Sequence, residues 1–106
     1  MPTSDELYEE AIQRRDAGDK PGAVEILKKA LAADPDFSIG HGLIAKLYAD
    51  LAMADDAIRH AQRVAELAPN DAFSFTALSV IFQRCGRIPE AEAAKARAFE
   101  LQHGLG

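Results

Sequence analysis

The chain has 106 residues, of which 48% are hydrophobic and 27% are charged, and its formal net charge is −5. This balance is typical of one folded globular domain and excludes a disordered chain. The excess of acidic residues argues against a nucleic-acid-binding protein, which needs clustered lysine and arginine.

The sequence lacks the features of a membrane or secreted protein. No run of ~18 apolar residues is present, so we expect no membrane-spanning helix. The first residues, Met1 to Glu6, are acidic where a secretory signal would be basic. The single cysteine, Cys85, cannot form an internal disulfide, which favours a reducing compartment. These features together predict a cytoplasmic protein.

Apolar residues recur at intervals of three and four along the whole chain, as in amphipathic helices, and no segment alternates as a strand would. Thr3 and Glu6 have the spacing of a helix capping box. Pro35-Asp36 and Pro69-Asn70-Asp71 are expected to end one helix and to cap the next. The pattern predicts six helices, at residues 4–17, 21–33, 38–51, 55–67, 72–85 and 89–102.

One unit occurs three times with a strict spacing of 34 residues. Small residues fall in phase in two sets: Ala23, Ala57 and Ala91; Gly18, Ala52 and Gly86. A strict period of this length is typical of a solenoid, in which each unit buries its apolar face against its neighbours. The sequence therefore predicts an all-α protein with one domain, residues 1–106, and repeats at 4–37, 38–71 and 72–105.

The unit resembles the tetratricopeptide repeat (TPR) family, whose signature is a large residue, an apolar and a small one, an aromatic, alanines and a closing proline. In the second repeat this signature falls on His41, Ile44, Ala45, Tyr48, Ala57 and Pro69. In the third it falls on Phe75, Leu78, Ser79, Phe82, Ala91 and Ala98. The resemblance implies a right-handed superhelical solenoid of three helix-turn-helix repeats that acts as a non-catalytic protein–protein interaction module or scaffold.

The resemblance also implies a concave groove, lined by the first helix of each pair, where partners of this family usually bind. Ile39, Leu43 and Phe73 are surplus to the needs of the core, so we expect them to bind an amphipathic helix or an extended apolar peptide. Three basic residues of the groove, Arg15, Lys46 and Arg84, would add selectivity for polar or acidic groups of the partner. Carried over by position, the groove residues are Tyr8, Ile12, Arg15, Ile39, Leu43, Lys46, Phe73, Thr76, Val80 and Arg84.

One subset of the family clamps the terminal carboxylate of chaperone tails with lysine, arginine and asparagine. None of these residue types stands at the matching positions here, so the resemblance does not imply this specificity. The matching positions hold Tyr8, Ile12, Leu43, Phe73 and Thr76.

The two ends of the array differ from its middle. Ile44 and Leu78 are replaced in the first repeat by Glu10, and Arg14 stands where the later repeats have aromatic residues. In the last helix, Glu92 and Lys95 stand where earlier repeats are apolar. We therefore expect both ends to face water, as in a complete protein of three repeats.

The last helix also supports an alternative function, a self-associating structural protein. Its outer apolar residues are expected to stay partly exposed, which would allow a homo-oligomer through this helix or through head-to-tail contacts with the acidic first repeat. These residues are Ala94, Ala98, Phe99 and Leu101.

The sequence offers no candidate for chemistry. His41, His60 and His103 show no i, i+4 spacing, and Cys85 has no nearby thiolate partner, so we expect no metal site. We expect His41 to lie at the edge of the core. A glycine-rich phosphate loop and a nucleophile elbow are both missing, which predicts neither a cofactor nor catalysis.

Overall fold

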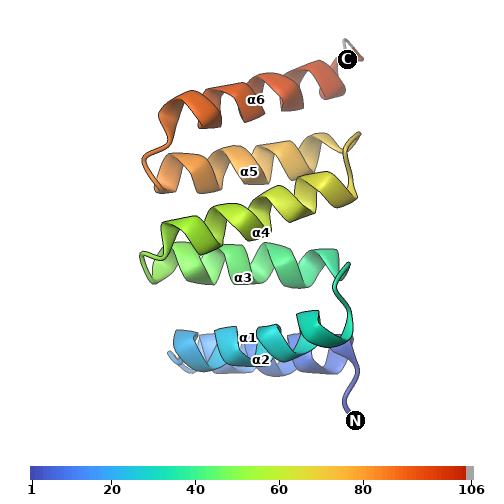
Figure 1. Ribbon diagram of the computed structural model, residues 1–106, viewed down its shortest axis with the longest axis vertical. Helices are drawn as coiled ribbons and strands as arrows, with labels where there is room; N and C mark the ends of the chain where they lie inside the picture. The colour runs from blue at the N-terminus through green and yellow to red at the C-terminus, as the bar shows by residue number, and fades with distance from the viewer. Residues whose placement is uncertain (105–106) are drawn as a thin grey trace.

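The structure, a computed structural model, describes residues 1–104 and folds them into helices that stack along one axis (Figure 1). Three antiparallel pairs, α1/α2, α3/α4 and α5/α6, follow one another from the N-terminus to the C-terminus. The stack measures 44 × 26 × 19 Å. The helices are α1 (Ser4–Asp16), α2 (Lys20–Ala33), α3 (Ser38–Asp50), α4 (Ala54–Leu67), α5 (Ala72–Arg84) and α6 (Ile88–Gln102). Every bound agrees with the sequence prediction to within one residue.

Side-chain caps begin several of the helices. The capping box at α1 is present, because Thr3 accepts from the Glu6 backbone at 3.1 Å and Glu6 accepts from the Thr3 backbone at 3.0 Å. Asp71 caps α5 as expected, accepting from the Phe73 backbone at 3.1 Å. The expectation for Asp36 is wrong, since Phe37 is the N-cap of α3 and makes no side-chain cap. Asp36 instead pairs with Arg63 of α4 at 2.6 Å.

The turn inside each helix pair uses a left-handed backbone conformation. Gly18 has φ +87° and Gly86 has φ +76°, where glycine is free of the steric penalty that a side chain brings. Ala52 holds the same place in the second repeat with φ +60°. The in-phase spacing of these three residues therefore marks one repeated turn, which is strained at its middle copy.

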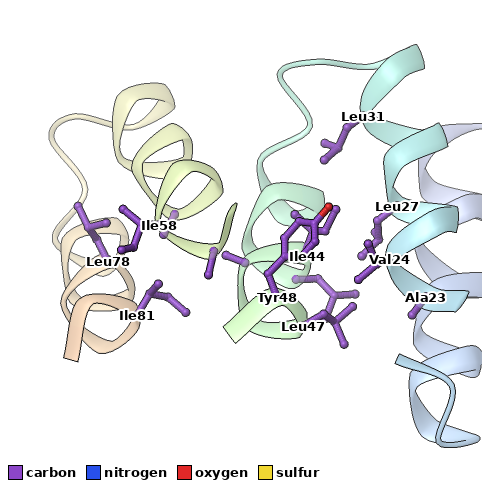
Figure 2. Close-up of a cluster of buried hydrophobic side chains, with 14 of the residues drawn as sticks. Ala23, Val24, Leu27, Leu31, Ile44, Leu47, Tyr48, Ile58, Leu78 and Ile81 are labelled. Carbon is purple, nitrogen blue, oxygen red and sulfur yellow. The ribbon is translucent and has the colours of Figure 1, made fainter. Parts of the chain in front are cut away.

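The core runs through the stack between the pairs (Figure 2). Leu27, Ile44 and Leu47 are the largest fully buried side chains, and they meet where α2 faces α3. Within each pair, fully buried alanines such as Ala11 and Ala23 let the two helices approach closely. The expected burial of the aromatic signature residues Tyr48 and Phe82 is confirmed, as both are at least nine-tenths buried.

The ends of the stack are mostly polar. Glu10, Arg14, Glu92 and Lys95 are exposed, as expected. The last helix differs from expectation at Ala94 and Ala98, which are buried because α6 packs along α5. Leu101 is partly buried, whereas Phe99 is 54% exposed. No helix within residues 1–104 is long and apolar enough to cross a membrane.

Candidate peptide-binding groove

The face formed by α1, α3 and α5 carries two adjoining hollows. The larger lies between α3 and α5, with α4 behind them, and has a volume of about 450 Å³. Small and branched apolar residues make its floor, and α5 contributes a wall along nearly its whole length. Its lining consists of Gly42, Ala45, Lys46, Ala61, Val64, Phe73, Thr76, Ala77, Val80, Ile81 and Arg84.

The smaller hollow lies between α1 and α3 and has a volume of about 290 Å³. It is lined by Tyr8, Arg15, Ser38, Ile39, Gly42, Leu43, Lys46 and Val64. Gly42, Lys46 and Val64 line both hollows, so the two are continuous. We call the combined feature the concave groove.

The structure brings nine of the ten residues expected in the groove into its lining. Ile12 is the exception, since it lies partly buried against the core and lines neither hollow. Leu43 lines the smaller hollow but is only 6% exposed, so the expectation that it is surplus to the core is wrong. Its position on α3 turns it towards the core more than the helical spacing alone suggested.

Three apolar side chains of the groove stand out into solvent. Phe73 is 83% exposed, Ile39 is 55% exposed and Val80 is 49% exposed. Tyr8 is held at one end by an edge-on contact with Phe37, at 5.9 Å between ring centroids. Large apolar side chains that gather in a groove, and contribute nothing to the core there, are typical of an interaction surface.

The charged residues of the groove lining are all basic. Arg15, Lys46 and Arg84 line the two hollows, and no aspartate or glutamate among the described residues does. Arg84 and Lys20 both bind Asp50 at one end of the groove, and the hydrogen bond from Arg84, followed by that from Lys20, lowers the pKa of Asp50. Arg15 pairs with Asp16 and Arg84 pairs with Asp50, so Lys46 is the one basic residue of the lining without an ion-pair partner within residues 1–104.

A histidine pair that the sequence did not reveal lies away from this lining. His41 of α3 and His60 of α4 face each other with 2.9 Å between their Nδ1 atoms, and His41 Nε2 lies 2.7 Å from the Pro35 carbonyl. Because a carbonyl only accepts, His41 donates from Nε2, and in the neutral pair its Nδ1 accepts from His60. Tyr48 stacks on His60 at 5.7 Å.

The environment of this pair disfavours a charge on His60. Burial is the main reason that the pKa of His60 falls to about 4, and the neighbouring charges of His41 and Arg59 lower it further. Asp56 acts in the opposite direction. His41 is buried, as expected for a residue of the core edge. No group of three or more potential metal ligands occurs in residues 1–104.

The comparison with protein families identifies the class of this chain. A family model described as tetratricopeptide repeat matches residues 14–81, so the chain belongs to the tetratricopeptide repeat family. The resemblance to this family and the all-α fold predicted from the repeat are thereby confirmed. No curated protein sequence is similar enough to the chain to count as a match.

Solved structures share the fold at low sequence identity. MamA superposes with a TM-score of 0.85 at 16% identity, over 96% of this chain and 60% of MamA. YrrB, described as a TPR protein with an unusual peptide-binding site, gives 0.83 at 18% identity, over 97% of this chain and 53% of YrrB. The second TPR domain of Spaghetti (RPAP3), bound to the HSP90 peptide SRMEEVD, gives 0.80 at 15% identity, over 93% of this chain and 92% of that one. This chain thus spans about 60% of the length of MamA and about half that of YrrB.

Proposed function

We propose that the chain is a non-catalytic interaction module that binds a peptide or helical segment of another protein in the concave groove. The observation that carries this proposal is the exposure of Phe73, at 83%, beside a continuous apolar hollow. A large aromatic side chain next to an open apolar trough can bury most of its surface only against a partner. The peptide-binding sites named for YrrB and for the Spaghetti domain support the same kind of function on the same fold.

The carboxylate-clamp specificity of one subset of the family is not part of this proposal. Thr76 and Phe73 stand among the positions that match the clamp, and neither can hold a carboxylate as lysine or arginine does. The groove instead offers apolar contact with scattered basic groups.

A library of random peptides displayed on phage tests the proposal when selected against the wild-type protein. Phe73→Asp should lower the affinity for the selected peptides at least ~30-fold, because an aromatic anchor of an interface contributes about 2 kcal/mol or more to binding. Phe99→Asp is the matched control, since Phe99 is an exposed phenylalanine on α6 outside the groove. Circular dichroism would verify that both variants fold. If Phe73→Asp binds the peptides as well as Phe99→Asp does, the groove is not the binding site.

The exposure of Phe99 also favours the second candidate, self-association through α6. Phe99 is 54% exposed, and its ring lies against that of His103 with 4.2 Å between centroids and an interplanar angle of 38°. Light scattering coupled to size-exclusion chromatography at about 50 µM separates the two candidates. An oligomer that Phe99→Asp dissociates and Phe73→Asp leaves intact would support self-association, and a monomer at this concentration would exclude it.

A further inference from the structure

Gly42 occupies a place in α3 where packing does not require glycine. A Cβ atom at Gly42 would meet no other atom within 4 Å. Gly40, one half-turn earlier, is different, because a Cβ there would come within 2.6 Å of the Phe37 ring. Glycine is the poorest helix former after proline, so Gly42 weakens α3 without relieving any clash.

The other two repeats fill the position that Gly42 leaves empty. Tyr8 and Thr76 stand at the equivalent places of α1 and α5. Gly42 lines both hollows, together with Lys46 and Val64, and it adds no side chain to the junction between them. The backbone of α3 is therefore open to close approach from the groove at this residue.

The groove has the length and charge to take a helix. The wall of the larger hollow extends along α5 from Phe73 to Arg84, which is roughly 16 Å at 1.5 Å per residue, or about three helical turns. Lys46 lies one turn after Gly42 on α3 and has no ion-pair partner within residues 1–104. A basic side chain at the centre of an apolar trough matches a partner that carries a carboxylate beside apolar side chains.

We propose that the occupant of the groove is an amphipathic, acidic helix of another protein, lying lengthwise between α3 and α5. Its backbone approaches α3 most closely at Gly42, where no side chain intervenes, and small groove residues such as Ala77 permit the same close approach. Its apolar stripe lies against Phe73 and Val80, and an acidic residue reaches Lys46. This inference rests on the proposed function and specifies the class of partner.

The probe is a displayed library of 16-residue peptides with leucine fixed at i, i+3, i+4 and i+7 and with Glu, Lys, Gln or Ala at the other positions. Wild-type protein should enrich peptides with glutamate flanking the leucine stripe, and Lys46→Glu should reverse this preference to lysine. Two results would overturn the acidic character of the partner. One is equal enrichment of glutamate and lysine peptides by the wild type, and the other is the same charge preference in Lys46→Glu as in the wild type.

Gly42→Leu tests the close approach. The substitution should raise the melting temperature by about 4 °C, since leucine is a better helix former than glycine. Because the added side chain occupies the groove, the affinity for the selected peptides should fall at least ~10-fold. Ala96→Leu, which adds similar bulk on an exposed face of α6, is the control and should leave binding unchanged. Full binding to Gly42→Leu would overturn the close approach.

A second library that carries a central proline decides between a helix and an extended peptide. Equal enrichment of the proline peptides would overturn the helical occupant. A failure of this inference is distinguishable from a failure of the proposed function, because Phe73→Asp tests the groove with unrestricted peptides. If only unrestricted peptides bind and Phe73→Asp abolishes that binding, the groove is the binding site but its occupant is not an acidic helix.

Discussion

The His41–His60 pair should make the stability of the protein depend on pH in the range where histidine titrates. Burial lowers the pKa of His60 from 6.5 to about 4. Below pH 6.5, His60 therefore binds a proton in the unfolded chain, whereas in the folded protein it stays neutral until about pH 4. Because the unfolded state binds more protons in this interval, the free energy of unfolding falls as the pH falls from 6.5 towards 4.

The size of this effect follows from the pKa and from the exposure of the ring. A pKa moved from 6.5 to about 4 corresponds to at most ~3 kcal/mol at 1.36 kcal/mol per unit. His60 is only half-buried, and solvent screening reduces such a contribution. We therefore expect the wild-type protein to lose about 1–2 kcal/mol of stability through this group between pH 6.5 and pH 4.

The double variant His41→Phe/His60→Ala removes the pair while keeping side chains that the fold already accepts. The third repeat carries Phe75 and Ala94 at the equivalent positions. Urea unfolding followed by circular dichroism at five pH values from 5 to 7.5, at constant ionic strength, gives the free energy of unfolding directly. The double variant should lose less than half as much stability over this range as the wild type.

Other groups contribute little in this window. The carboxylates with lowered pKa, such as Asp19 and Asp50, stabilise the fold above their unfolded pKa of 3.8 and lose that contribution only as the pH falls further. His103→Gln, at the exposed end of α6, controls for the loss of a histidine outside the pair. An equal pH-dependent loss in the double variant and the wild type would refute the reasoning.

Single substitutions in the core, a turn and an ion pair should have separable effects on the urea midpoint. Leu27→Ala removes a fully buried side chain and should cost about 2–5 kcal/mol; a loss below 1 kcal/mol would show that the α2–α3 contact is loose. Ala52→Gly should stabilise the protein by ~1 kcal/mol, because φ is +60° at that residue, and destabilisation would contradict the strained turn. Asp50→Ala should cost less than ~1 kcal/mol, since the side chains of both basic partners, Lys20 and Arg84, are more than a third exposed, and a larger loss would mean that the ion pairs hold the repeats together.

The helices and their turns could be predicted because their causes are local. Apolar spacing, the capping box at Thr3 and the left-handed turns at Gly18 and Gly86 act within a few residues of each helix end. A strict 34-residue period then repeats each local cause three times. Because the same signals occur in each repeat, every predicted helix boundary lies within one residue of the observed one.

The details of the surface could not be predicted because they depend on the rotation of each helix against its neighbours. Leu43 and Ala98 both lie at the edge of an apolar stripe, and a small rotation decides whether such a residue is buried. His41 and His60 are 19 residues apart and meet only through the packing of α3 on α4, so no spacing rule pointed to them. The sequence analysis did not select Gly42 for the groove. Glycine has no side chain, so it adds nothing to the apolar pattern from which groove residues are predicted.

The equivalent positions of the three repeats show where this chain is free to specialise. The small buried residues inside each helix pair differ little from repeat to repeat, as at Ala23, Ala57 and Ala91, because the two helices of every pair must approach closely. The position held by Gly42 varies between glycine and the larger Tyr8 and Thr76. Substitutions at such positions change the shape of the surface without changing the stacking, so a recognition site can arise at one repeat of an otherwise regular array.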